Sequence, residues 1–294
     1  MRNRLQVIVS LGAAGLLLLT GCGSSGGDNP TVETSSTAAP LASLLPQALR
    51  DKGTLVVGSD VAYAPVEFFD TDGKTVIGID PDLGKAIGKQ LGVELKFVNG
   101  TFDGLITSLK AKRLDLIMSA MSDNKKRQAE IDFVDYFTAG TSILVKKGNP
   151  QKITSLDDFC GKTIAVQRTT TQDDVATAQQ KKCAANGQKL SVLKFDRDTE
   201  ALLQVKQGRA AADMNDFPVA AYNAKQAPND FEVVGQQIEA GPYGVGVRKE
   251  DTALRDAIKA AIQAIIDNGE YAKILQTWSV TNGAVTAAAL NGGS

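Results

Sequence analysis

The sequence of 294 residues contains no histidine and only three cysteines. The absence of histidine excludes Ser-His-Asp and Cys-His catalysis, a histidine general base and metal sites built on histidine. The sequence also has no cysteine cluster with metal-ligand spacing and no glycine-rich phosphate loop. No metal and no cofactor is therefore expected, although an enzyme that works through carboxylates or lysine stays possible.

The sequence also lacks an excess of charge of either sign. Its 32 basic and 33 acidic residues give a net charge of −1, whereas a nucleic-acid partner would require a basic face. At 43% hydrophobic and 22% charged residues, the composition is typical of a soluble globular protein. Roughly 250 residues follow the N-terminal region, enough for one large domain or two of ordinary size.

The first twenty residues have the pattern of a secretory signal peptide. Two arginines precede an apolar run of thirteen residues, 7–19, which is too short for an ordinary membrane span. The segment Leu19-Thr20-Gly21-Cys22 resembles the lipobox of bacterial lipoproteins. This resemblance implies a signal peptide over residues 1–21 and a lipid on Cys22, which would anchor the protein to the extracytoplasmic face of the cell membrane. The alternative is an ordinary signal peptide with a coincidental cysteine.

Residues 22–40 are rich in glycine, serine, threonine and proline and hold few large apolar groups. Such a segment cannot bury enough surface to offset the entropy lost on ordering. We therefore expect a flexible tether between the membrane and a folded body.

The two remaining cysteines are Cys160 and Cys183. If Cys22 carries lipid, they form an even pair outside the cytoplasm, where disulfides persist. We expect a bridge between them, and two free buried thiols are the alternative.

Strands and helices alternate along the rest of the chain, which predicts a mostly parallel α/β sheet. Strands are expected at residues 55–58, 93–98, 114–118, 143–145, 162–166, 192–195, 211–214 and 245–247. Helices are expected at residues 81–91 with Asp80 as the N-cap, and at 102–109, 125–131, 174–186, 200–206, 251–267 and 271–278. Ligands bind at the carboxyl ends of the strands in such sheets, so one cleft can collect the polar residues that follow them.

One strand-to-helix junction combines apolar strand residues with hydroxyls and an arginine. Residues 114–118 predict a buried strand, and Ser122 or Asp123 fits the N-cap of the helix that follows. A helix start favours an anion, and Arg127 adds a planar fork of donors that matches a carboxylate. The hydroxyl of Ser119 flanks the same junction. The alternative is a capped helix whose arginine is merely solvated.

Two junctions in the second half also carry polar residues. Thr170 and Thr171 follow the strand at 162–166, either as ordinary helix caps or as further hydroxyl ligands. Asp216 follows the strand at 211–214, two residues before Pro218. It fits a plain N-cap, and it equally fits a carboxylate that faces the cleft.

From about residue 53 to residue 278 the chain resembles the bacterial extracellular solute-binding proteins of family 3, the receptors of ABC importers for polar amino acids. The motifs that carry the resemblance are Gly78-Ile79-Asp80-Pro81-Asp82-Leu83, Ile117-Met118-Ser119-Ala120-Met121-Ser122 with Arg127, Thr170-Thr171-Gln172, Gly208-Arg209, Asp216 and Gly246-Val247-Arg248-Lys249. Pro81 departs from the aliphatic residue or threonine that is usual there, but proline suits the first turn of a helix.

The resemblance implies two α/β lobes that close on a ligand between them, the type II fold of periplasmic binding proteins. Residues 41–141 with 243–294 would form one lobe, and residues 142–242 the other. Hinges are then expected near residues 141–143 and 241–243. The resemblance also implies a monomer that delivers its ligand to an ABC permease in the membrane.

The resemblance further implies a role for each cleft residue. Arg127, the amide of Ser122 and Thr171 would bind the α-carboxylate of an amino acid, whereas Asp216 and the backbone around Ala120 would bind its α-ammonium. Many relatives have serine at the position of Ala120, so one hydroxyl is missing here. The other expected ligand-binding residues are Ser119, Thr170, the aromatic pair Tyr63 and Phe102 on either side of the ligand side chain, and Asp60 and Gln167 at its far end.

The carboxylate of Asp60 favours a ligand side chain that donates a hydrogen bond. We therefore expect glutamine or a basic amino acid ahead of glutamate, which would face like-charge repulsion in a desolvated cleft. An inward turn of the neighbouring Arg168 would instead favour an acidic ligand. The alternative function is an enzyme on the same fold that resembles the secreted arogenate or prephenate dehydratases, which need a general acid in the cleft.

Overall fold

The computed structural model describes residues 39–294. The expected signal peptide, the lipid site at Cys22 and most of the tether therefore lie outside the described residues. The described residues form one compact unit. Within the described part of the chain, no helix has both the length and the apolar character that a membrane span requires.

A nine-stranded mixed sheet runs through residues 39–294 in the order β5-β1-β6-β11-β7-β10-β8-β9, with β12 beside β7. Its strands are β1 (Thr54–Ser59), β5 (Glu94–Asn99), β6 (Leu116–Ile117), β7 (Asp132–Lys146), β8 (Thr163–Gln167), β9 (Ser191–Phe195), β10 (Ala212–Asp216), β11 (Phe231–Val247) and β12 (Ala289–Leu290). A small second sheet consists of β2 (Ala62–Tyr63), β3 (Glu67–Phe69) and β4 (Val76–Ile77).

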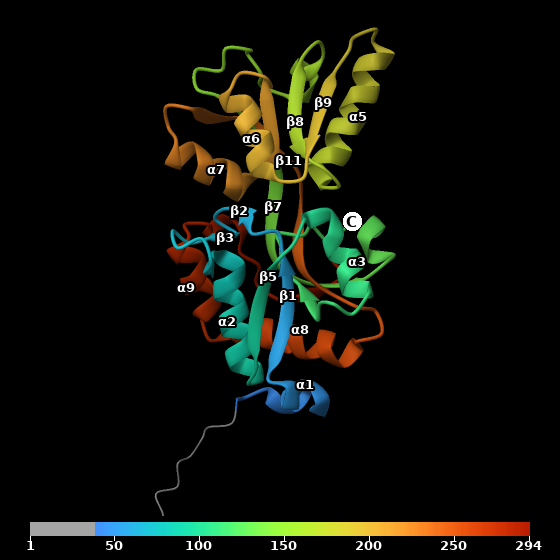
Figure 1. Ribbon diagram of the computed structural model, residues 1–294, viewed down its shortest axis with the longest axis vertical. Coiled ribbons are helices and arrows are strands. Elements are labelled where there is room, and N and C mark those ends of the chain that lie inside the picture. The colour runs from blue at the N-terminus through green and yellow to red at the C-terminus, as the bar shows by residue number, and fades with distance from the viewer. Residues whose placement is uncertain (1–38) are drawn as a thin grey trace, which may run out of the picture. The chain divides into compact units, whose positions relative to one another are not determined.

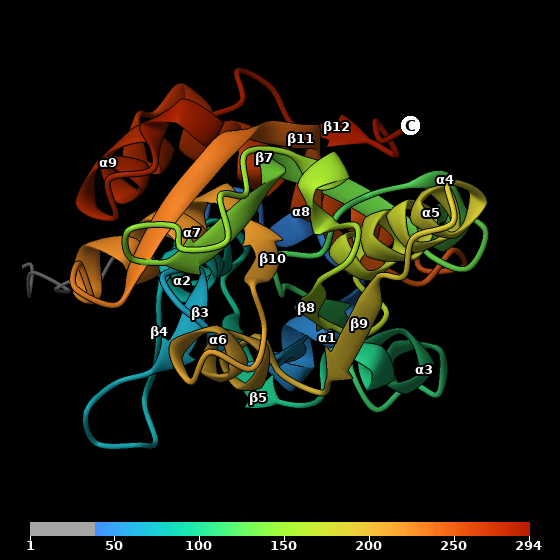
Figure 2. The same ribbon diagram turned by 90° about the horizontal axis from the view of Figure 1, so that it is seen from above.

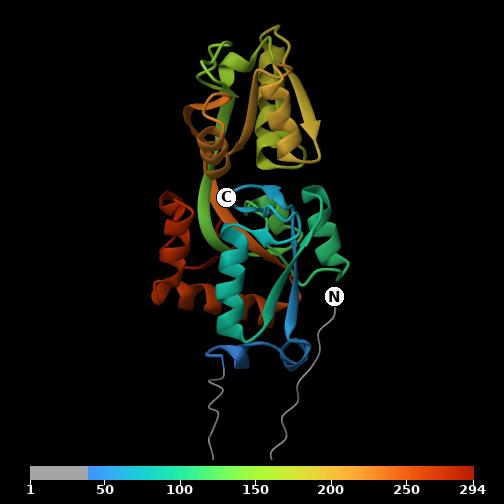
Figure 3. The same ribbon diagram turned by 60° about the vertical axis from the view of Figure 1, so that its left-hand side comes forward.

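The large sheet is parallel at both ends and antiparallel in the middle. Strands β5, β1 and β6 are parallel and form a first strand group, and β10, β8 and β9 are parallel and form a second. The strands β7 and β11 pair antiparallel with one another and connect the two groups. Figure 3 shows these two strands, β7 in green and β11 in orange, passing together from one group to the other. The parallel α/β arrangement expected from the sequence is confirmed.

Helices cover each strand group (Figure 1). The helices of the first group are α1 (Gln47–Lys52), α2 (Ile79–Leu91), α3 (Leu105–Lys110), α4 (Lys125–Gln128), α8 (Thr252–Asp267) and α9 (Glu270–Thr277), and those of the second are α5 (Thr171–Ala185), α6 (Asp198–Lys206) and α7 (Phe217–Gln226). Short 3₁₀ turns lie at Ala42–Leu44, Phe102–Gly104, Leu156–Phe159 and Thr281–Gly283.

Each group buries its own apolar side chains. Leu83 and Ile87 of α2 pack with Ile258 and Ile262 of α8 in the first core. The i, i+4 spacing of these residues gives each helix one apolar face, as the sequence predicts. Ile164 and Val166 of β8 belong to a separate core in the second group. Figure 2 shows β10 lying between β7 and β8, which joins the second group to the crossing strands.

Two predicted helix N-caps are wrong. Helix α2 begins at Ile79 and not after Asp80, because Gly78 adopts a positive φ of 133° that permits the turn. Asp80 therefore lies inside the helix and is fully buried. Helix α4 spans only Lys125–Gln128, and the side chain of Asn124 caps it by accepting a bond from the Arg127 amide at 3.0 Å, so neither Ser122 nor Asp123 is the cap.

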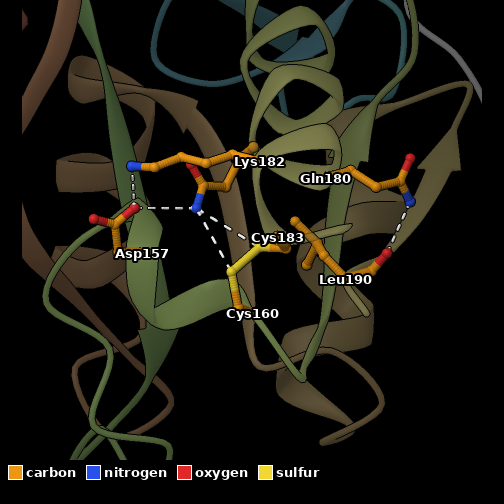
Figure 4. Close-up of a disulfide and its surroundings, with 7 residues drawn as sticks. Asp157, Cys160, Gln180, Lys182, Cys183 and Leu190 are labelled. Atoms are coloured by element: carbon orange, nitrogen blue, oxygen red, sulfur yellow. Dashed lines mark hydrogen bonds and ion pairs between the residues drawn. A yellow bond between two sulfur atoms is a disulfide. The ribbon is translucent and has the colours of Figure 1, made fainter. Parts of the chain in front are cut away.

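A disulfide joins Cys160 to Cys183, as expected from the cysteine pair, with 5.3 Å between the Cα atoms. Cys160 follows the 3₁₀ turn at Leu156–Phe159, and Cys183 lies in α5, where it is completely buried. Figure 4 shows the ion pair that flanks the bridge, in which Lys182 Nζ lies 2.6 Å from Asp157 Oδ1. The bridge thus fixes the turn to the helix of the second group.

Reduction of this disulfide is expected to lower the free energy of unfolding by about 3 kcal/mol, because it removes a closed loop from the unfolded chain. The measurement is denaturant unfolding with and without reductant. The double variant Cys160→Ala/Cys183→Ala is the control, and reductant should leave its midpoint unchanged. An equal shift in both proteins would contradict a stabilising bridge.

Candidate binding cleft

A cavity lies where the two strand groups meet. All eleven residues predicted to bind ligand line it, and Glu67 and Gln172 line it as well. We call these thirteen residues the binding cleft, and they are Asp60, Tyr63, Glu67, Phe102, Ser119, Ala120, Ser122, Arg127, Gln167, Thr170, Thr171, Gln172 and Asp216.

The cleft collects the carboxyl ends of strands from both groups. Asp60 follows β1, Ser119 and Ala120 follow β6, and Phe102 lies just after β5. From the other group, Gln167 ends β8 and Asp216 ends β10. Residues more than one hundred positions apart therefore meet because parallel strands point their carboxyl ends to one edge of a sheet.

Arg127 supplies the positive charge of the cleft. Its side chain donates to the carbonyl oxygens of Ser122 at 2.7 Å and Thr169 at 3.1 Å, and its guanidinium lies 5.2 Å from the centre of the Phe102 ring. The residue is only 7% exposed, and burial lowers its pKa to about 10, so it stays charged at neutral pH. Among the described residues, no carboxylate lies within ion-pair distance of it.

The expected contribution of a helix start to anion binding is weaker than the sequence indicated. Helix α4 has only four residues, and Asn124 already accepts from one of its free amides. A helix this short has little macrodipole. The candidate anion site therefore depends on Arg127.

Asp216 supplies a negative charge on the opposite wall. Its carboxylate accepts from Tyr63 Oη and from Gln172 Nε2, both at 2.9 Å. Asp216 occupies the N-cap position of α7 but makes no side-chain capping bond, so the carboxylate faces the cleft. Burial raises its pKa to about 6, although these hydrogen bonds and the charge of Arg127 favour the ionised form.

Asp60 forms the far end of the cleft together with residues of the second group. Its carboxylate accepts from Gln167 Nε2 at 2.6 Å and from Arg197 Nη1 at 3.1 Å. Burial raises its pKa to about 6, against the lowering effect of these two partners. Sequence reasoning missed Arg197, which lies in the loop before α6 and carries no motif that marks it.

A buried hydrogen-bond network supports the cleft from below. Ser119 Oγ accepts from the amide of Asp60 at 2.8 Å and donates to Glu67 Oε1 at 3.0 Å. The amide of Ala120 and Tyr136 Oη donate to Asp80, at 3.2 Å and 2.6 Å. Burial and the nearby Asp80 raise the pKa of Glu67 well above its usual range, which favours its uncharged form.

Arg168 does not reach the cleft. Its side chain is 45% exposed and pairs with Asp196 at 2.8 Å on the surface. A second bond joins it to the carbonyl oxygen of Lys194 at 3.3 Å. The inward turn that would favour an acidic ligand is absent from the structure.

Comparison with known proteins agrees with this geometry. The family model of the bacterial extracellular solute-binding proteins, family 3, matches residues 55–281. The arginine-binding protein ArgT of Corynebacterium glutamicum is 32% identical over 250 residues, which cover 84% of this chain and 81% of that protein.

Two solved structures share the fold. An ancestral arginine-binding protein bound to glutamine is 38% identical with a TM-score of 0.71, covering 78% of this chain and 98% of that one. The ancestral amino acid-binding protein AncCDT-1, a precursor of cyclohexadienyl dehydratase, is 36% identical with a TM-score of 0.72, covering 79% of this chain and 97% of that one. Both matches place this chain among two-lobed binding proteins.

Buried carboxyls should make the protein more stable in mild acid. Burial raises the pKa of Asp60 and Asp216 to about 6 and that of Asp198, behind the cleft, to about 7. Because the folded state then binds more protons than the unfolded state, the free energy of unfolding should fall as pH rises from about 5 to about 8. Thermal unfolding across this range measures the effect.

The variant Asp198→Asn should show a smaller decrease, since it removes one of these groups without changing its shape. Asp51→Asn, at an exposed position of α1, is the matched control and should keep the wild-type slope. Stability that rises with pH in the wild type would contradict the proposed protonation of the buried carboxyls.

Proposed function

Since this chain belongs to the bacterial extracellular solute-binding proteins of family 3, we propose that it binds a polar or basic amino acid in the cleft and delivers it to an ABC importer. One observation carries the proposal, namely that Arg127 and Asp216 are buried in one cavity without forming an ion pair with each other. A free amino acid carries an α-carboxylate that can pair with Arg127 and an α-ammonium that can pair with Asp216. Burying such a zwitterion is costly unless each of its charges is paired.

The arrangement suggests a role for each wall of the cleft. Arg127 and the hydroxyl of Thr171 bind the α-carboxylate, and Asp216 binds the α-ammonium. The amide of Ala120 donates to Asp80, so it is the carbonyl of this residue that can accept from the ammonium group. Tyr63 and Phe102 then enclose the ligand side chain.

The far end of the cleft favours side chains that donate hydrogen bonds. Asp60 there accepts from Gln167 and Arg197 and offers no donor of its own once ionised. Glutamine, arginine, lysine and histidine fit this end better than glutamate. The relatives described above include proteins named for arginine and a structure holding glutamine, which supports this class of ligand.

We also infer that the two strand groups act as lobes, with residues 41–141 and 243–294 in one lobe and 142–242 in the other. Hydrogen bonds from Tyr63 to Asp216 and from Gln167 to Asp60 join these lobes across the cleft. The pairing of β11 with β7 has register shifts between Val234 and Gly244, close to the proposed hinge at residues 241–243. A lipid on Cys22 would hold the monomer at the membrane beside the permease.

Binding is better supported than dehydration of prephenate or arogenate. A dehydratase needs a general acid that reaches the substrate. Asp60 and Asp216 both have partners that suit ligand binding, and Glu67 Oε1 is occupied by a hydrogen bond from Ser119. The AncCDT-1 relative is itself an amino acid-binding protein.

The variants Arg127→Ala and Asp216→Ala should each weaken amino-acid binding more than a hundredfold. Each leaves one buried ligand charge unpaired, which costs on the order of 3–5 kcal/mol. Calorimetry with glutamine and arginine measures the loss. Arg168→Ala and Asp196→Ala remove the same charges from an exposed pair nearby and should bind like the wild type. Binding by either cleft variant within threefold of the wild type would contradict the proposed site.

Affinity should also depend on pH through Asp216. Because only its ionised form pairs with the α-ammonium, ligand binding lowers its pKa below the value of about 6 that burial produces. Affinity should therefore be constant above about pH 7 and should weaken as pH falls through about 6, by at most tenfold per unit for this group. Calorimetry at several pH values tests this expectation, and a constant affinity down to about pH 5 would contradict it.

A further inference from the structure

We propose that Arg197 is a specificity-determining residue, which competes with a cationic ligand side chain for Asp60 and so sets how the cleft discriminates between charged and neutral ligands. The inference rests on the proposed function, because it concerns the side chain of a bound amino acid. Neither the family motifs nor the expected site residues include Arg197.

The geometry places Arg197 at the end of the cleft where the ligand side chain would lie. Its Nη1 donates to Asp60 Oδ1 at 3.1 Å, while Gln167 Nε2 donates to Oδ2 at 2.6 Å. Both carboxylate oxygens of Asp60 thus have donors from the second strand group. A ligand that donates to Asp60 must either use a remaining lone pair of these oxygens or displace one of the two donors.

The two donors differ in what they do to a cation. Gln167 is neutral, so its displacement or rearrangement changes no charge at the far end. Arg197 carries a positive charge that a guanidinium or ammonium group would have to approach or expel. One carboxylate cannot pair fully with two cations, and Asp60 is only 3% exposed, so little water is present to compensate the cation left unpaired. A neutral amide or ureido group can instead donate to Asp60 while Arg197 keeps its place.

Arg197 is more exposed to solvent than the carboxylate that it contacts. Its side chain is 31% exposed, whereas that of Asp60 is 4% exposed. The charges of Asp103 and Glu200 also act on Asp60, and the carboxylate of Glu200 accepts from the amide of Arg197 at 3.3 Å. Glu200 thus gives a displaced arginine side chain another carboxylate nearby. Arg197 therefore lowers the affinity for cationic side chains without excluding them from the cleft.

Arginine and citrulline form a matched ligand pair for testing this proposal. They have the same length and shape, but citrulline has a neutral ureido group where arginine has a guanidinium. Calorimetry at about pH 7.5 gives the ratio of their dissociation constants. The variant Arg197→Ala should shift that ratio at least tenfold in favour of arginine, because it removes the competing cation.

Arg168→Ala is the control, because it removes an arginine from the neighbouring loop that pairs with Asp196 and not with Asp60. It should change the ratio less than twofold. Arg197→Lys keeps the positive charge and should stay within threefold of the wild type. In the Asp60→Asn background, Arg197→Ala should shift the ratio less than threefold, because the group for which Arg197 competes has lost its charge.

An unchanged ratio in Arg197→Ala, or a shift toward citrulline, would overturn the proposal. A full tenfold shift in the Asp60→Asn background would also overturn it, since Arg197 would then act through the general field of the site. These outcomes leave amino-acid binding intact. Failure of the wild-type protein to bind citrulline or any of the twenty common amino acids would instead overturn the proposed function, and this inference with it.

Discussion

The burial of two opposite charges in one cleft is the constraint on which the rest of the structure depends. Arg127 is held by two carbonyl oxygens, and Asp216 by a tyrosine hydroxyl and a glutamine amide. These neutral hydrogen-bonding groups stabilise each charge in the protein interior without neutralising it. A buried charge that is only partly compensated favours a ligand that completes the compensation. A single amino acid compensates both charges, because its carboxylate can pair with Arg127 and its ammonium with Asp216.

The crossing strands β7 and β11 place these two charges on opposite walls of one cleft. The strands within each group are parallel, so the cleft residues that end or follow them lie at the carboxyl edge of each group. Because β11 pairs with β6 of the first group, β7 pairs with β10 of the second, and the two pair with each other, they bring these two edges face to face in the compact unit. The two charges therefore lie on separate strand groups. The affinity for a ligand that contacts both charges then depends on the relative position of the two groups.

Local sequence patterns predicted most of the elements, and the resemblance to the family implied the eleven expected members of the cleft. Strand periodicity, helix faces and glycine ends are local properties, and the motifs around Ser119 and Asp216 are short. The length of β7 was missed because nearly all of its residues are buried on both faces, which leaves no alternation to detect. The cap of α4 was missed because three consecutive residues, Ser122, Asp123 and Asn124, are outside the helix and several suit the role.

Contacts between residues far apart in the chain could not be predicted in this way. Glu67 lines the cleft and is linked through Ser119 to the backbone of Asp60, and Arg197 contacts the cleft residue Asp60 across 137 positions of sequence. Neither residue lies in a motif, since its role arises only when two strand groups meet. Such residues lie at the far end of the cleft, whereas Arg127 and Asp216 lie where the common part of every amino acid would bind.

This separation has a physical consequence for ligand choice. The groups proposed to bind the α-carboxylate and α-ammonium share no hydrogen bond with Asp60, Gln167 or Arg197. Changes at the far end can therefore alter the preferred side chain while leaving recognition of the amino-acid backbone intact, as expected when sites lack shared partners. Similar sequences that are named for arginine, or that hold glutamine, fit this division of the cleft. On this argument, the choice among amino acids depends on how the charge of Asp60 is balanced, and the affinity common to all of them depends on Arg127 and Asp216.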